Sequence, residues 1–140
     1  MTEFALSPDP PIKLIDGLPV SLWKKRYRTR RMGEIRYYIQ ERISEWRKKA
    51  GPPSDLTVDF LVDLYQRQKG KCYYSGIPLV LNSRKGHAVP NSISLDRIDP
   101  DKGYTQRNVV WCTYFVNTMK GNLTESEFLG LLRLILKTRS

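Results

Sequence analysis

The sequence predicts an α+β protein in which a two-stranded hairpin is followed at once by a short helix, with flanking helices and a basic N-terminal helical arm. Apolar residues recur every three or four positions over 33–49 and 57–68, the spacing of helices that pack on one side. Between 92 and 112, two short apolar runs flank a turn around Gly103, which is typical of a hairpin. Residues 113–120 then indicate a short helix that ends at Gly121.

Length and charge narrow the class of protein. The 140 residues suffice for one ordinary domain with an added arm. The chain has 24 Lys and Arg against 14 Asp and Glu, a formal net charge of +10, which favours a polyanionic partner. No run approaches the roughly 20 apolar residues of a membrane span. The N-terminus does not resemble a secretory signal, and two cysteines are too few for a disulfide scaffold, so we expect a cytoplasmic protein with packed, reduced thiols.

The arm begins after a proline-rich lead-in of about 20 residues, which we expect to be extended or poorly ordered. In the segment 23–31, six of nine residues are basic and none is acidic, with Trp23 and Tyr27 among them. Such a segment can contact phosphates while a ring stacks or wedges between bases, although a solvated face or a localisation signal has the same composition. The candidate DNA-binding residues are Lys24, Lys25, Arg26, Arg28, Arg30 and Arg31.

The helix over 33–49 has an apolar stripe and a basic side, and Gly51 followed by two prolines ends it. A second helix runs from Thr57, a suitable N-cap, to Gln68, and Gly70 is a good stop. Residues 71–74 and 79–81 indicate short strands, and 82–91 a polar loop.

Strands are expected over 92–97 and 109–112. Trp111 and Tyr114 are expected in the core, and Phe115 and Val116 on the buried side of the short helix. The sequence Thr-Glu-Ser-Glu at 124–127 is a capping box that opens a last helix. The apolar face of that helix comprises Phe128, Leu131, Leu132 and Ile135.

The hairpin and the following helix bring a small set of polar residues together. Asp96 lies near the end of the first strand, and the helix can aim Asn117 at the same point. One carboxylate and one amide oxygen are hard ligands suited to Mg²⁺ or Mn²⁺. Lys120 shares the helix face of Asn117 and can neutralise a phosphate. Asn108 can hold the hairpin loop closed, although an ordinary Asx turn explains it almost as well.

In five blocks the chain resembles the phage-type HNH endonucleases, over roughly residues 57–136. The blocks are Gly70–Leu79, Ser94–Asp99, Lys102–Thr105, Asn108–Trp111 and Val116–Lys120. The resemblance implies a ββα-metal (His-Me finger) core in which Asp96 and Asn117 bind the metal. It also implies that Asn108 is structural and that Lys120 lies near the phosphate.

Two departures from the family pattern stand out. The paired C-x-x-C motifs of many members are broken at Cys72 and Cys112, so we expect packing in place of a structural zinc. Arg97 stands where the family usually has the histidine that serves as general base, and a guanidinium is a poor base but a good phosphate clamp. The base is left open among His87, the only histidine, Asp99, Tyr104 and a metal-bound water, and the site is also open to being slow or inactive.

The leading interpretation is a Mg²⁺- or Mn²⁺-dependent endonuclease that cuts double-stranded DNA, as a monomer that nicks or as a homodimer. Residues 54–140 form the nuclease domain, and residues 1–53 are a basic extension for DNA contact. The resemblance suggests a homing, packaging-associated or free-standing nuclease in a bacterial host or a phage-infected cell. The alternatives are a nucleic-acid-binding module that has lost its activity and a basic structural RNA-binding protein.

Overall fold

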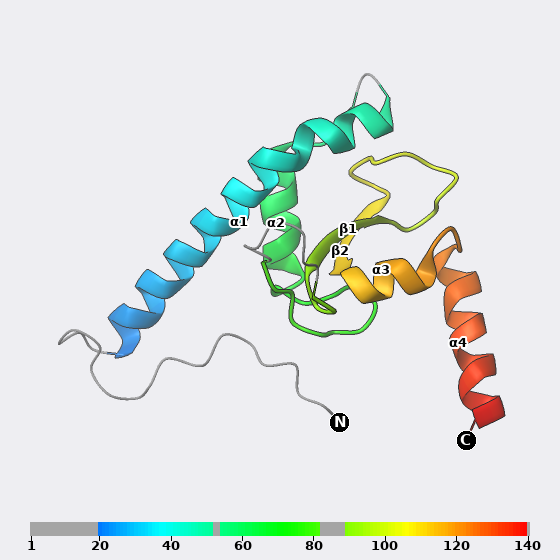
Figure 1. Cartoon of the computed structure of the whole chain (residues 1–140). Coiled ribbons are helices and arrows are strands. Elements are labelled where there is room, and N and C mark those ends of the chain that lie inside the picture. The colour runs from blue at the N-terminus through cyan, green and yellow to red at the C-terminus, as the bar shows by residue number, and fades with distance from the viewer. Residues whose placement is uncertain (1–19, 52–53, 82–88, 140) are drawn as a thin grey trace.

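The computed structural model describes residues 20–51, 54–81 and 89–139, which form four helices and one two-stranded antiparallel sheet (Figure 1). The predicted α+β class is confirmed. In chain order the helices and strands are α1 Val20–Ala50, α2 Val58–Arg67, β1 Ile93–Arg97, β2 Val109–Thr113, α3 Tyr114–Lys120 and α4 Glu125–Arg139. In these ranges no helix is both long and apolar enough to cross a membrane.

Helix α1 is a single helix of 31 residues, about 46 Å long. The prediction that helical order starts at Gly33 was therefore wrong, and the basic segment belongs to the same helix. Lys and Arg are good helix formers, no proline interrupts the segment, and Arg30 pairs with Glu34 one turn later at 3.2 Å. The second half packs on the body through the predicted stripe, which comprises Ile35, Ile39, Ile43 and Trp46.

Helix α2 begins as the sequence predicted. The Thr57 hydroxyl accepts a hydrogen bond from the Phe60 amide at 3.0 Å, and Leu61 and Tyr65 are buried against the core. An exposed ion pair of 2.8 Å between Arg36 and Asp59 links α1 to the first turn of α2. The two helices thus cover one side of the sheet, as Figure 1 shows.

Helix α2 ends at Arg67 with Gln68 as its C-cap, and Gly70, two residues after the cap, has a backbone conformation that a side chain opposes. Its φ is +66°, and a Cβ there would lie 2.9 Å from the Tyr65 hydroxyl. We expect Gly70→Ala to lower the free energy of unfolding by about 2 kcal/mol, because left-handed strain and the contact add. Gly130→Ala is the control, since nothing lies within 4 Å of its Cβ position in α4. Urea unfolding measures both, and equal stability of the two variants would contradict the prediction.

The sheet consists of β1 and β2 alone, in a register that pairs Leu95 with Trp111. The strands predicted at 71–74 and 79–81 form only isolated bridges, Lys71 with Pro78 and Val80 with Ser92. A tight turn occupies this segment, with the Cys72 amide bonded to the Ile77 carbonyl at 2.7 Å, and Pro78 has no amide to donate. The prediction of full strands here was wrong.

The outer edge of β2 is covered by the side chain of Gln68. Its amide accepts a hydrogen bond from the Trp111 amide at 2.9 Å and donates to the Trp111 carbonyl at 2.8 Å. The Tyr73 amide donates to the same carbonyl at 2.9 Å. The main chain of Trp111 is therefore bonded on the side away from β1, where no third strand lies among the described residues.

The core forms where α1, α2 and the sheet meet. Trp111 is fully buried, and Cys72 and Cys112 are buried free thiols, so the packing predicted for these three residues is confirmed. Tyr114 and Phe115 are exposed by 44% and 53%, which contradicts their expected burial. The seven-residue helix α3 instead turns its polar positions, above all Lys120, toward the sheet.

Helix α4 starts with the predicted capping box. The Thr124 amide donates to Glu127, and the Glu127 amide donates to the Thr124 hydroxyl, both at 3.2 Å. Phe128 is buried and meets the ring of Tyr74 edge-on, with centroids 6.0 Å apart. Leu131 and Ile135 remain exposed, because the helix runs away from the body after its first turns (Figure 1).

Candidate functional site

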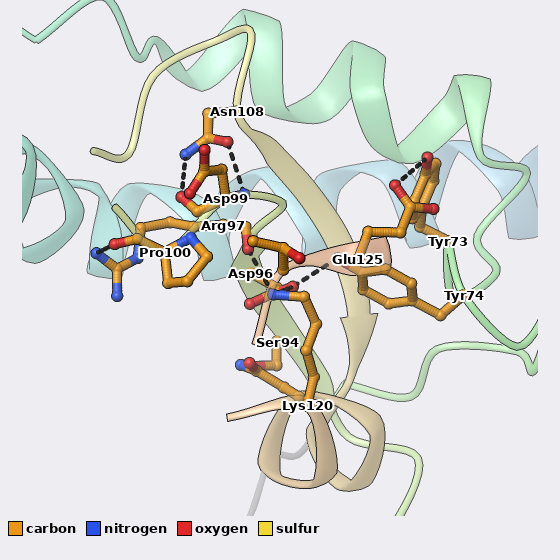
Figure 2. Close-up of polar contacts among 12 residues, drawn as sticks. Tyr73, Tyr74, Ser94, Asp96, Arg97, Asp99, Pro100, Asn108, Lys120 and Glu125 are labelled. Carbon is orange, nitrogen blue, oxygen red and sulfur yellow. Dashed lines mark hydrogen bonds and ion pairs between the residues drawn. The ribbon is translucent and has the colours of Figure 1, made fainter. Parts of the chain in front are cut away.

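Asp96 is the centre of the polar cluster between β1 and α3. It is only 6% exposed, and its Oδ2 takes part in one hydrogen bond and one ion pair (Figure 2). The Tyr74 hydroxyl donates to it at 2.7 Å, and the Lys120 ammonium lies 3.2 Å away. A buried carboxylate that receives two donors on one oxygen is held in a fixed orientation.

Lys120 is buried together with Asp96. It is 1% exposed, and its Nζ also donates to the Arg97 carbonyl at 2.8 Å. The ammonium thus points into the protein in this structure, whereas the sequence analysis expected it to meet a phosphate. Burying a lone charge is costly, so each of the two charges needs the other.

Asn117 lies on the same side of β1. Its Nδ2 donates to the Ser94 hydroxyl at 2.7 Å, and Ser94 and Asp96 share a face of the strand because side chains alternate. The helix therefore places Asn117 over Ser94 and Lys120 over Asp96. In Figure 2 the side chains of Ser94, Asp96 and Lys120 lie between β1 and α3.

Two side-chain oxygens of this face take no hydrogen bond among the described residues, Oδ1 of Asp96 and Oδ1 of Asn117. In the same part of the chain no buried side-chain nitrogen or oxygen lacks a partner. The Asp96 Oδ1 must therefore reach solvent, although the residue as a whole is buried. The cluster presents one carboxylate oxygen and one amide oxygen outward.

Asn108 closes the hairpin loop. It accepts a hydrogen bond from the Asp99 amide and donates to the carbonyls of Asp99 and Gly103, each at 2.9 Å. The Asn108 carbonyl also accepts from the Ile98 amide at 2.9 Å. Asn108 makes the loop contacts that the sequence predicted, and it is 5% exposed.

Arg97 lies on the other face of β1 from Asp96, since it is the next residue of the strand. Its guanidinium donates to the Pro100 carbonyl at 2.9 Å and lies 5.2 Å from the ring centre of Tyr104. Figure 2 shows it pointing away from Asp96. The structure therefore does not bring Arg97 together with Asp96 and Asn117, and its backbone carbonyl is its only direct link to Lys120.

The other residues considered as general base are His87, Asp99 and Tyr104. His87 lies outside the described residues. The Asp99 carboxylate accepts from the Asp101 amide at 3.0 Å and lies 3.9 Å from the Lys102 ammonium. Tyr104 is half-buried beneath Arg97.

Two groups beside Asp96 hold their protons strongly. Burial, followed by the hydrogen bond to Asp96 and its charge, raises the pKa of Tyr74 far above its usual value. Burial, followed by the charge of Asp96, likewise raises the pKa of the Cys112 thiol. Tyr74 is therefore a donor to Asp96 at neutral pH and not a base.

These raised pKa values predict a loss of stability at alkaline pH. The unfolded chain releases the Cys112 proton near the ordinary value of 9.0, and the folded protein retains it. Above about pH 9 the unfolded state then binds fewer protons, so the free energy of unfolding falls as pH rises. We expect the urea midpoint to fall between pH 8 and pH 10, and to fall less in Cys112→Ala. The same slope in both proteins would contradict the prediction.

The six basic candidates lie near the beginning of α1, apart from this cluster (Figure 1). Lys24, Lys25, Arg28 and Arg30 are exposed, and nothing is described of the Arg26 side chain. Arg31 donates to the Leu79 carbonyl at 3.3 Å and lies 3.6 Å from Glu34.

Three residues in or near the cluster around Asp96 were not predicted from the sequence: Tyr74, Ser94 and Glu125. Ser94 was available in principle, because it lies two positions before Asp96 on an alternating strand. Tyr74 and Glu125 come from distant segments, and the Tyr73 hydroxyl donates to Glu125 at 3.3 Å. No local pattern indicates either contact.

The described residues contain no group of three or more His, Cys, Asp or Glu placed to hold a metal ion. Neither protein-family models nor curated proteins give a match to this chain.

Proposed function

We propose that the protein is a metal-dependent endonuclease that hydrolyses phosphodiester bonds of double-stranded DNA, built on a ββα-metal core. The observation that carries the proposal is the pair of outward oxygens, Oδ1 of Asp96 and Oδ1 of Asn117, on one face of the hairpin–helix unit. The net charge of +10 supports a nucleic-acid substrate.

The donor set fits Mg²⁺ or Mn²⁺. Both ions prefer hard oxygen ligands and accept water and phosphate oxygens in the remaining positions. Asp96 and Asn117 would hold the ion, which when bound stabilises negative charge on the leaving oxygen. Because the described residues supply only these two oxygens here, water and the substrate phosphate would complete the site.

The neighbouring residues orient the two ligands. Tyr74 and Lys120 both bind Oδ2 of Asp96, which turns Oδ1 outward. Ser94 binds the nitrogen of the Asn117 amide, which leaves the oxygen for a ligand. Asn108 fixes the loop that joins the two strands. Such supporting contacts commonly change metal affinity by about 10–100-fold.

A second candidate is a DNA-binding module without nuclease activity. Two observations favour it: Lys120 already neutralises the charge of Asp96, and the guanidinium of Arg97 is directed at Pro100. In the first candidate the general base is still to be assigned among His87, Asp99, Tyr104 and a metal-bound water.

The test is cleavage of supercoiled plasmid with Mg²⁺, with Mn²⁺ and with a chelator. The variant is Asn117→Ala, and Asn122→Ala is the matched control because Asn122 is exposed five residues later. We expect metal-dependent nicking that falls by about 100-fold or more in Asn117→Ala and is unchanged in Asn122→Ala.

Cleavage that survives the chelator, or that Asn117→Ala retains in full, would refute the metal site. Binding without cleavage in either metal, across a genomic library of target sequences, would favour the second candidate.

A further inference from the structure

The face that α1 turns toward the body changes its chemistry along the helix. From Arg31 to Trp46 this face packs on the body, with Ile35, Ile39 and Ile43 at its centre. Counting back from Ile35 in steps of four, three and four residues gives Arg31, Arg28 and Lys24, and Lys25, about 100° round the helix from Lys24, lies at the edge of this stripe. The stripe is thus apolar where it packs on the body and basic in the residues that precede that part of the helix.

The basic part of the stripe extends beyond the body. Arg31 joins the helix to the body through the Leu79 carbonyl at 3.3 Å. Lys24, Lys25 and Arg28 are exposed. Residues 20–30 continue the helix by about 16 Å, and Figure 1 shows them projecting past α2 and the sheet. The side of the overhang (residues 20–30) that continues this stripe is called its inner face here, and it is basic and exposed.

The opposite side of the overhang is different. Arg30 points about half a turn away from Arg28 and pairs with Glu34 at 3.2 Å. No acidic residue occurs between Val20 and Gly33, so the overhang has no carboxylate of its own, and Glu34 pairs with Arg30 and also lies 3.6 Å from Arg31 where the overhang meets the body. The cations that the sequence grouped together are thus divided between two faces of the helix.

We infer that a DNA duplex lies along the inner face of the overhang, with its phosphates against Lys24, Lys25 and Arg28. The charge of the face is complementary to a phosphate backbone, which carries about one charge per 1.7 Å of duplex axis. The choice of DNA among polyanions rests on the proposed function; the choice of the inner face rests on the geometry of α1.

The first experiment compares two pairs of substitutions that remove the same charge from α1. Lys24→Ala/Arg28→Ala removes inner cations, and Arg30→Ala/Lys48→Ala removes exposed cations on the outer side. Binding of the full-length chain to a labelled 30-base-pair duplex is measured by anisotropy with chelator, between 50 and 200 mM salt.

We expect the inner pair to weaken binding about tenfold or more and to reduce the salt slope by about 1.8, since each phosphate contact contributes about 0.9. The outer pair is expected to change affinity less than about threefold. Equal losses from both pairs would overturn the assignment to the inner face.

The second experiment rotates the overhang. Two alanines inserted between Thr29 and Arg30 turn the preceding residues by about 200°, whereas four turn them by about 400° and so return them to within about 40°. The insertion point preserves the contacts of Arg30 and Arg31. We expect the two-alanine insertion to weaken DNA binding as much as the substitutions Lys24→Ala/Arg28→Ala do. We expect the four-alanine insertion to bind within about threefold of the unaltered protein. Equal binding by both insertions, with circular dichroism showing an intact fold, would overturn the inference.

Binding in chelator separates this inference from the nuclease proposal. If the substitutions and the insertions change binding as expected but the protein never cleaves DNA, the nuclease proposal is refuted and the binding face is supported. Tighter binding of a double-stranded RNA of the same length would overturn the choice of DNA.

Discussion

Lys120→Met is expected to lower the free energy of unfolding by roughly 3–5 kcal/mol, one of the two largest effects in the protein. The ammonium is the charged partner of Asp96 at 3.2 Å, and both residues are almost completely buried. Methionine matches the length of the side chain but leaves the largely buried carboxylate without a cation, with the Tyr74 hydroxyl as the donor to its Oδ2. Removing one partner of a buried pair is far more destabilising than removing both.

The double substitution Asp96→Asn/Lys120→Met is therefore expected to be more stable than Lys120→Met alone. Lys102→Met serves as the surface control. The Lys102 side chain is 72% exposed, and its ammonium lies 3.9 Å from the Asp99 carboxylate, a distance at which an exposed ion pair contributes little. Urea unfolding of the three variants measures these differences in stability. If the double variant is less stable than Lys120→Met, the two charges do not depend on each other and our account of the pair is wrong.

Trp111→Ala is expected to cost about 3–5 kcal/mol through the loss of the largest buried side chain. Its ring meets Trp46 edge-on with centroids 5.7 Å apart and lies 6.4 Å from Tyr38, so α1 and the sheet both lose packing. The indole Nε1 also donates to the Leu61 carbonyl at 3.0 Å, a contact to α2. One substitution thus loosens three parts of the core.

Trp111→Phe separates packing from hydrogen bonding, because it retains an aromatic ring and removes the Nε1 donor. We expect an intermediate loss, since the buried Leu61 carbonyl then lacks its partner. Tyr114→Ala is the control for a nearby exposed aromatic residue, with an expected change within about 0.5 kcal/mol. Thermal or urea unfolding of all three tests the order. A Trp111→Ala protein as stable as Tyr114→Ala would show that the indole does not join α1 to the sheet.

The hairpin, the short helix and the caps could be predicted because each depends on local chemistry. Thr57, Gly70 and the Thr124 capping box act on neighbouring amides, and the alternation at 93–97 shows in the sequence itself. Which residues of α3 and α4 are buried was harder to predict from the sequence. Helix α3 has only about two turns. Whether it buries Phe115 or Lys120 depends on the residues packed against it, and those residues come from other parts of the chain.

The same limit applies to the candidate site. Spacing alone placed Asp96, Asn117 and Lys120 on neighbouring faces, and the structure brings all three onto one side of β1. Spacing did not indicate that Tyr74, 22 residues before Asp96, donates to the carboxylate, or that Lys120 turns inward. It also failed for α1, where the predicted boundary at Gly33 followed the change from basic to apolar residues and not a change in backbone conformation.

Gln68 has a consequence for how this small sheet behaves in solution. A two-stranded ribbon normally exposes open backbone groups along which another chain can add, and such edges promote aggregation. By binding both main-chain groups of Trp111, the Gln68 amide imitates one residue of a neighbouring strand. The Trp111 amide proton should accordingly exchange with solvent as slowly as the centre of a larger sheet. In Gln68→Ala the Trp111 amide loses its partner while the carbonyl keeps the Tyr73 amide, so we expect this edge to promote self-association through β2.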